Sequence, residues 1–466
     1  MAKTIVLAVL DSLRYDIFFD YLSADGSPFI KQFVNSGVNF TGATATAPWS
    51  LPSHASMFTG KYPREHGALR SNTRIRSDTP TLTDRLNDRG FVTACFTSNE
   101  FIRPDFGFNG WDRCPDHYGH ARFPDAHSPL SDETGINKLL DALGQVVDSE
   151  KPHKSFLNAV YAQAKRSPPL LDDHGKIMTR DMVQWLDRLP NQDDLFLFCN
   201  YMETHDYHRQ ISSIRKRLWN VAHKKDLDAI QSILRSVEMS PHDPLMSKGE
   251  IELFKTLMMD ELRYVDRLLD RLYQALEEQG RADDCLFILC ADHGEGAGER
   301  GFVYHALGGI TEPIVRVPLV VSSPNTMEKE IRERVSLAWV YSTVLDFADS
   351  QTGPNLVDPS TYPNIVGTEN TNHVIDIVDS TDAIDEYYLK PRLGVYQTGD
   401  PERKYVRIGD EYSTRAIEAN GLTEDDIEEN GKQFLRQFER EHESVDKQRF
   451  SLNESTKSRL QDMGYI

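Results

Sequence analysis

Four runs of seven mostly apolar residues recur along this chain of 466 residues, and they constrain its fold more than any other feature. Because apolar and β-branched residues are continuous in them rather than alternating, they are typical of strands buried on both faces. The runs are Thr4–Leu10, Phe91–Thr97, Leu195–Tyr201 and Cys285–Ala291, with a shorter one at Val317–Val321. Amphipathic helical patterns lie between them, the clearest over Ile251–Leu276. Strands alternating with helices predict an α/β fold around a mostly parallel sheet.

Composition divides the chain into unequal parts. Residues 1–365 carry the strand and helix pattern, whereas the chain is strongly polar and acidic from about residue 366 onward. We therefore expect a catalytic domain over 1–365 and a smaller C-terminal subdomain over 366–466. Within the larger part, residues about 115–190 and 208–248 are polar and helical without a strand pattern, and we expect them to be insertions over the top of the sheet.

The balance of charges excludes one class of partner. Lys and Arg number 52 against 72 Asp and Glu, a net charge of −20, whereas a nucleic-acid binder needs a basic surface to displace counterions. No stretch approaches the length of a transmembrane segment, and the first apolar run is too short for a signal peptide. We therefore expect a cytoplasmic protein. Five cysteines, an odd number without a paired spacing, indicate neither a disulfide framework nor a zinc site.

Side chains suited to a metal ion follow the predicted strands. In an open parallel sheet, ligands bind beyond the carboxyl ends of the strands. Asp11 follows the first run and Asp292-His293 follows the fourth, while Asn99 and His205 come after the second and third. Two carboxylates and an imidazole form a mixed oxygen and nitrogen ligand set for a divalent cation. Asp11 alone could equally be a helix N-cap, and it is the combination of the three residues that favours a metal site.

Ser50 is the candidate nucleophile. It stands just before Pro52, where an apolar helical pattern begins, and this order predicts Ser50 at the helix cap with the proline in the first turn. Free N–H groups and the helix dipole favour an anion at that place. A hydroxyl there, next to a divalent cation, could be deprotonated and attack a phosphorus or sulfur centre. A plain N-cap serine without a chemical role is the alternative.

In their order and spacing, these segments resemble the sulfatase family of the alkaline-phosphatase superfamily. The resemblance rests on TIVLAVLDSLRYD, SLPSHASMFTGKYPREHG, NYMETHDYH, CLFILCADHGE and RVPLVV. It implies a three-layer α/β/α sandwich and metal-dependent hydrolysis of a sulfate or phosphate ester. The substrate would be an anionic ester, either a small molecule or one linked to a glycan, and the oligomeric state stays open.

The resemblance also assigns roles to single residues. One divalent ion (Ca, Mg, Mn or Zn) would be held by Asp11, Ser50, Asp292 and His293. Ser50 would be the covalent nucleophile. His205 and His305 would stabilise the oxyanion or protonate the leaving group, and Asn99 would steady the transferring group. Glu295 is expected on a solvated glycine-rich loop, and His66 is expected to fix a turn beside the nucleophile helix.

The chain departs from the family pattern at several positions. Sulfatases carry Cys or Ser followed by x-Pro-Ser-Arg, and the first residue becomes formylglycine; here His54 replaces the arginine, which argues against formylglycine at Ser50. Ser12 stands where many sulfatases have a second aspartate. These departures keep two other functions open. One is a transferase that passes a phosphoglycol- or phosphoethanolamine-type group to an acceptor, and the other is a non-catalytic relative that binds an anion or a glycan.

Overall fold

The computed structural model describes the greater part of the chain. The described residues are 2–24, 29–70, 73–115, 146–147, 151–156, 174–205, 248–297, 305, 309–324, 329–349, 353–370, 390–398, 403–416, 424–446 and 449. Both predicted insertions lie largely outside them. None of the helices described combines the length and the apolar content needed to cross a lipid bilayer.

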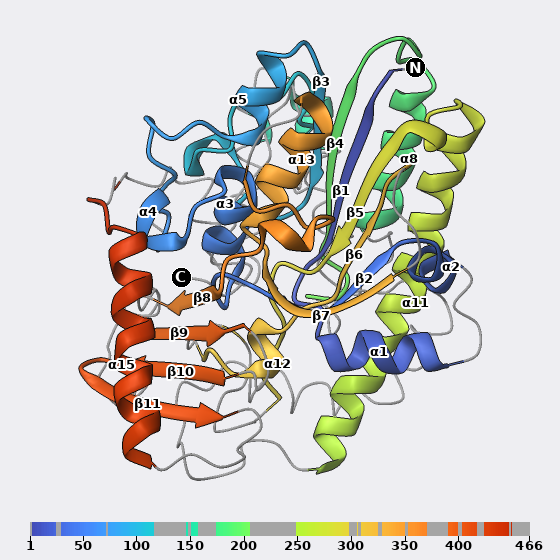
Figure 1. Ribbon diagram of the computed structural model, residues 1–466. Coiled ribbons are helices and arrows are strands. Elements are labelled where there is room, and N and C mark those ends of the chain that lie inside the picture. Colours follow the sequence, from blue (N-terminus) through green and yellow to red (C-terminus); the bar gives the residue numbers. More distant parts are fainter. Residues whose placement is uncertain are drawn as a thin grey trace.

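A seven-stranded sheet forms the centre of the molecule (Figure 1), with strand order β3-β4-β1-β5-β6-β2-β7. Its strands are β1 (Thr4–Leu10), β2 (Val38–Thr44), β3 (Val92–Thr97), β4 (Leu195–Tyr201), β5 (Cys285–Cys290), β6 (Leu319–Ser322) and β7 (Lys329–Ser336). The pairs β3–β4, β4–β1, β1–β5 and β2–β7 are parallel, which confirms the mostly parallel sheet. All residues of β1, β4 and β5 are buried, as their unbroken apolar sequences predict.

The exception to the parallel arrangement is β6, the strand predicted at Val317–Val321. It runs antiparallel to both β5 and β2. The residue after β5 lies beside the residue before β6: the N–H of Ala291 donates to the carbonyl of Pro318 (3.1 Å). A parallel strand needs a crossover back to the opposite edge. Because β6 starts beside the end of β5, it can only run the other way.

Helices cover both faces of the sheet, which confirms the three-layer sandwich (Figure 1). One layer packs around α11 (Lys248–Glu278), the long helix predicted over residues 251–276. The other layer packs around α3 (Ser50–Thr59) and α13 (Trp339–Asp349). The first layer also holds α1 (Tyr15–Ser23), α2 (Phe29–Ser36) and α8 (His174–Leu186), and the second also holds α4 (Pro63–His66) and α5 (Leu82–Asn87).

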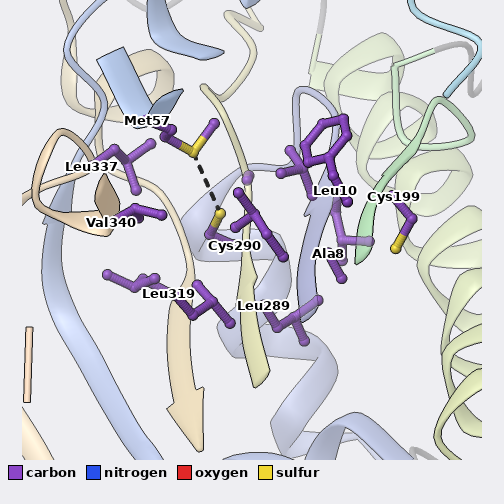
Figure 2. Packing of buried hydrophobic residues seen from close by; sticks show 14 of the residues in the cluster. Ala8, Leu10, Met57, Cys199, Leu289, Cys290, Leu319, Leu337 and Val340 are labelled. Atoms are coloured by element: carbon purple, nitrogen blue, oxygen red, sulfur yellow. Dashed lines mark hydrogen bonds between the residues drawn. The ribbon is translucent and has the colours of Figure 1, made fainter. Parts of the chain in front are cut away.

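The core joins the helix that carries Ser50 to the strand that precedes Asp292. Sγ of Cys290, at the end of β5, lies 3.9 Å from Sδ of Met57 on α3 (Figure 2). Met57 is fully buried, and Leu337 and Val340 lie in the same part of the core. Close packing of this kind transmits small displacements rather than absorbing them. The position of α3 relative to β5 is therefore fixed by apolar contact.

A second, smaller sheet stands beside the first, with helix α15 (Glu424–Glu441) against it (Figure 1). It is antiparallel in the order β11-β10-β9-β8. Its strands are β8 (Ile365–Asn370), β9 (Arg392–Gln397), β10 (Arg403–Ile408) and β11 (Glu411–Ala416). Phe438 of α15 and Tyr405 of β10 belong to its own small apolar core.

A partly buried ionic cluster links the two sheets. Glu312, in the short helix α12 (Glu312–Val315), lies 2.9 Å from Arg334 of β7 and 3.0 Å from Lys404 of β10. Burial alone would raise the pKa of the Glu312 carboxyl, but these two cations outweigh it and hold the pKa well below its ordinary value. Glu312 therefore carries a negative charge shared between the sheets.

Candidate active site

The polar residues predicted after the strands meet at one edge of the central sheet. The four strands that deliver them, β3, β4, β1 and β5, are consecutive neighbours in the sheet and all parallel. Their carboxyl ends therefore lie side by side. Asn99, His205, Asp11 and the pair Asp292-His293 follow them in that order and are all buried.

Three of these residues form a group that fits a metal ion. One ligand atom each of Asp11, Asp292 and His293 lies within 4.8 Å of the others. Nδ1 of His293 donates to the carbonyl of Gly294 (2.8 Å), so Nε2 presents a lone pair. That atom lies 3.4 Å from Oδ2 of Asp292 and 3.9 Å from Oδ1 of Asp11.

The oxygen Oδ2 of Asp292 gives an independent test of that fit. It is buried and accepts no hydrogen bond from the residues that the structure describes. An unsatisfied buried carboxylate oxygen is costly. Two imidazole nitrogens lie 3.4 Å from it, Nε2 of His293 and Nδ1 of His54, and the proton of the latter goes to the carbonyl of Ser50. A cation between this oxygen and Nε2 of His293 would satisfy both atoms. The donor set, two carboxylates and one imidazole, suits a divalent ion.

Gly294 makes the ligand loop possible. Its N–H donates to the carbonyl of Ile314 (2.6 Å), and a Cβ at this position would collide with the carbonyl of Pro313. Only glycine allows the backbone to approach α12 this closely. The same residue offers its own carbonyl to His293, so the close approach fixes the orientation of the ligand.

Asp11 accepts several hydrogen bonds, one of them from the hydroxyl of Ser12 to Oδ1 (3.2 Å). Its Oδ2 accepts from the side-chain amides of Asn99 (2.8 Å) and Asn200 (3.1 Å), and its main-chain carbonyl accepts from the hydroxyl of Thr204 (2.6 Å). Burial raises the pKa of Asp11, but His205 and the other nearby histidines outweigh it, and the net shift is downward. Asp11 is thus kept ionised with its other oxygen, Oδ1, turned toward His293 and Ser50.

Ser50 joins this group from the helical layer. Its Oγ lies 3.3 Å from Nε2 of His293 and 3.5 Å from Oδ1 of Asp11. The prediction that Ser50 caps the helix is wrong: α3 begins with Ser50 as its first helical residue, and Trp49 is the N-cap, with extended backbone and no side-chain cap bond. Because the hydroxyl does not close the helix end, it is directed to the ligand group instead.

His54 lies one helical turn after Ser50. Its Nδ1 donates to the carbonyl of Ser50 (2.9 Å), and its Nε2 faces the amide nitrogen of Asn200 at 3.4 Å. The ring is fully buried and contacts Phe198 edge-on. His54 therefore connects α3, the helix that carries Ser50, to the side-chain amide of Asn200, which donates to Asp11.

Ser12 turns the chain immediately after Asp11. Its φ is +60°, in the left-handed region that residues other than glycine seldom adopt. In this conformation the N–H of Ser12 donates a hydrogen bond to Oδ1 of Asp292 (3.1 Å). Strained backbone persists where the surroundings enforce it, which is common at functional sites. The main chain at Ser12, just after β1, is thus hydrogen-bonded to the side chain that follows β5.

His205 and His305 complete the site beside His293. The ring of His305 lies 4.4 Å from that of His293 and 5.1 Å from that of His205, measured between centroids. Asn99, by contrast, uses its amide nitrogen on Asp11. Its predicted contact with the transferring group stays a prediction.

Glu295 contradicts the expectation of a solvated loop. Its side chain is fully buried, and Nδ1 of His305 lies 3.1 and 3.2 Å from its two carboxylate oxygens. Burial raises the pKa of Glu295 well above its ordinary value, although His205 and Arg14 oppose the rise. Arg14, itself buried, donates to the main-chain carbonyl of Glu295 (3.0 Å). The Gly-rich sequence around Glu295 hid this, because it is equally typical of a surface turn.

His66 lies away from this group, as predicted. Its Nε2 lies 3.1 Å from the hydroxyl of Ser56 and 3.2 Å from the carbonyl of Pro52, and its Nδ1 accepts from the N–H of Ala68. Burial lowers the pKa of His66 to about 3. It is a neutral residue that joins α3 to the turn after α4.

Sequence reasoning missed three residues around Asp11 and Asp292. Asn200 was concealed inside an apolar run, and Thr204 and Ser53 look like ordinary loop and helix residues. Ser53 donates to the carbonyl of Asp292 (2.6 Å). The polar residue at the end of an otherwise apolar strand was the one available signal, because a buried amide needs a partner.

Comparisons with known proteins identify the family and the fold of the chain. The sequence model of the family described as Sulfatase matches residues 3–350. An arylsulfatase of Clostridium perfringens is 20% identical over 394 residues, which are 77% of this chain and 78% of the relative. Among solved structures, the phosphonate monoester hydrolase of Silicibacter pomeroyi superposes with a TM-score of 0.60 at 16% identity, covering 96% of this chain and 99% of the other.

A further solved structure is a complex with D-glucosamine-2-N,6-O-disulfate, the substrate of the protein concerned. It superposes with a TM-score of 0.63 at 14% identity and covers 95% of this chain and 97% of the other. These structural likenesses show the fold, while the sequence match extends over most of the chain. On that match, which contains every predicted site residue, the chain belongs to the sulfatase family of ester hydrolases.

Proposed function

We propose that this enzyme is a metal-dependent hydrolase of a sulfate or phosphate ester, with Ser50 as its covalent nucleophile. The observation that carries the proposal is the convergence of the Ser50 hydroxyl on Nε2 of His293 and Oδ1 of Asp11, at 3.3 and 3.5 Å. A buried hydroxyl among metal-ligand atoms is arranged for attack rather than for helix capping.

Asp11, Asp292 and His293 would hold the ion, with the Ser50 oxygen as a further ligand. A divalent cation there would polarise the ester and favour the deprotonated form of the serine hydroxyl. The unsatisfied Oδ2 of Asp292 supports this assignment. Ca, Mg, Mn and Zn are the candidates.

The side chains supply the remaining steps. Ser50 releases its proton to solvent, and its Oγ forms a bond to the phosphorus or sulfur atom while the bond to the leaving-group oxygen breaks. His305 donates a proton to that oxygen, and His205 stabilises the charge on the transferring group. Water then attacks the serine ester, and His305 takes a proton from that water while the bond to Oγ of Ser50 breaks. Ser50 regains its proton from solvent, which restores the starting state.

We infer that Ser50 acts without conversion to formylglycine. His54 in place of the motif arginine supports this, because its Nδ1 donates to the carbonyl of Ser50 and its Nε2 faces the amide of Asn200. A serine activated by a metal can attack phosphorus and form a phosphoserine. This favours a phosphorus ester, carried by a small molecule or a glycan, over a sulfate ester.

A paired rate assay tests the proposal. The protein, loaded in turn with Ca, Mg, Mn and Zn, is given an aryl phosphate, an aryl phosphonate and an aryl sulfate with one common leaving group. We expect turnover of a phosphorus ester that disappears in Ser50→Ala and persists in Ser56→Ala, a buried serine of the same helix that contacts His66. Mass spectrometry of the peptide containing Ser50 should show unmodified serine.

Other outcomes would replace parts of the proposal. Sulfate turnover together with the mass of formylglycine would make the enzyme a sulfatase that matures despite His54. Transfer of the phosphoryl-linked group to added alcohol in preference to water would make it a transferase. Tight metal binding without turnover of any ester would support a non-catalytic binding protein.

A further inference from the structure

Glu295 and His305 form a buried acid–imidazole pair that the roles assigned so far do not use. The two carboxylate oxygens lie at nearly equal distances, 3.1 and 3.2 Å, from Nδ1 of His305. Both side chains are fully buried. A carboxyl group on one ring nitrogen fixes the orientation of an imidazole and leaves the other nitrogen to meet a substrate.

The acid is itself held in place. Arg14 donates to the main-chain carbonyl of Glu295 (3.0 Å), and Asp16 binds the other side of the guanidinium with two contacts of 2.8 Å. Gly294, the preceding residue, is fixed against α12 by its hydrogen bond to Ile314. Glu295 is therefore part of a rigid segment that begins at the ligand His293.

The imidazole on the other side of the pair lies against the reacting groups. The ring of His305 is 4.4 Å from that of His293, whose Nε2 is 3.3 Å from the hydroxyl of Ser50. Since Nδ1 of His305 is engaged by Glu295, a contact between this ring and a leaving group would be made through Nε2.

We propose that Glu295 is a positioning residue, which holds His305 so that Nε2 meets the leaving-group oxygen of the ester. The proposal rests on the proposed function, because it presupposes that His305 protonates that oxygen. Glu295 itself touches neither substrate nor metal. Its effect should therefore depend on how much the leaving group needs a proton.

A leaving-group series separates this role from a structural one. Glu295→Leu keeps approximate volume and removes both acceptor oxygens, whereas Glu295→Gln keeps one. On esters of weakly acidic alcohols we expect Glu295→Leu to lower kcat by about 10–100-fold with little change in KM. On esters of strongly acidic phenols the loss should be below about 3-fold, because such groups leave without a proton. Glu295→Gln should recover part of the rate.

The double variant supplies a second criterion. If Glu295 acts through His305, Glu295→Leu should cause no further loss in a His305→Ala background. A matched control is Glu369→Gln in β8, a buried acid paired with Arg64 rather than with His305, which should leave the leaving-group dependence unchanged. Equal losses on every ester, or losses that multiply in the double variant, would overturn the proposal.

A spectroscopic measurement keeps the two proposals distinguishable. In protein with ¹⁵N-labelled histidine, the Nδ1 signal of His305, assigned with His305→Ala, should be that of a hydrogen-bonded nitrogen in the native chain and should change in Glu295→Leu. If the native protein cleaves no ester, the proposed function fails while this signal still decides whether Glu295 holds the ring. An Nδ1 signal unaffected by Glu295→Leu would overturn the positioning role.

Discussion

Nδ1 of His54 lies 3.4 Å from Oδ2 of Asp292, yet its proton is directed to the carbonyl of Ser50 at 2.9 Å. The ring therefore lies against the ligand group while its hydrogen bond goes to the main chain. An arginine at this place would bring a fixed positive charge to Asp292.

The first prediction concerns His54. Replacement by Ala removes the partner of Asn200 and opens a cavity beside Asp292. We expect metal affinity to fall by about 10–100-fold, as is usual when a residue that orients a ligand is lost. Isothermal titration with each metal measures this. His66→Ala, which also removes a buried histidine from the same layer, should cost stability but leave metal affinity within about 3-fold; equal effects of the two exchanges would contradict the role of His54.

The second prediction concerns the two amides on Asp11. Asn99 and Asn200 both donate to Oδ2, at 2.8 and 3.1 Å. Exchange of either for Leu removes one donor and should weaken metal binding by about 10–100-fold, with the larger loss at the shorter bond. Competition with a chelator measures both affinities. Unchanged affinity in both variants would show that metal binding by Asp11 does not depend on these two hydrogen bonds.

The third prediction is a pH dependence of stability. The folded protein lowers the pKa of Glu312 below the unfolded value of 4.5, so its contribution is present above pH 4.5. That contribution is lost progressively as the pH falls toward the lower pKa of the folded state. We expect Glu312→Gln to cost about 1–3 kcal/mol at pH 7, less than a fully buried pair because the side chain is 36% exposed.

Urea unfolding of both proteins between pH 7 and pH 3 checks this expectation. The difference in free energy of unfolding between native chain and variant should shrink on acidification. A difference that is constant over this range would show that the charge of Glu312 is not what stabilises the junction.

The fourth prediction concerns the core contact between α3 and β5. Met57→Ala should destabilise the protein by about 2–5 kcal/mol, through lost burial and a residual cavity. The same exchange should lower kcat, because Met57 holds the helix that carries Ser50 against the strand before Asp292. Met57→Leu conserves volume and should cost less than about 1.5 kcal/mol. Thermal unfolding and the rate assay together test this. A loss of stability without a loss of kcat would show that the contact between Met57 and Cys290 does not position Ser50.

The sequence predicted a mostly parallel sheet and the residues that follow its central strands. It did not predict all of the strands or their order. Strands buried on both faces reveal themselves by unbroken apolar runs, so β1, β3, β4 and β5 and the residues after them could be recognised. The edge strand β7 is largely polar and exposed in its first half, and β2 alternates, so neither has that signal. Strand order depends on crossovers between distant segments, which local periodicity does not report.

Site residues that directly follow strands could be predicted from the sequence. Those whose position depends on the packing of a helix or a loop could not. Asp11, Asp292 and His293 follow from parallel strands, because neighbouring carboxyl ends must meet. The cap at Trp49 and the burial of Glu295 depend on how a helix and a loop pack. Ser50 and Glu295 were accordingly misplaced in detail although both were recognised as residues near the site.

The hydrogen bond from Ser12 to Asp292 joins residues separated by 280 positions. On a ribosome adding about 5–20 residues per second, Asp292 is made on the order of 15–60 s after Ser12. Asp11 and Ser50 are therefore made well before Asp292 and His293. The buried group of these four side chains can assemble only after β5 has been synthesised and has paired with β1.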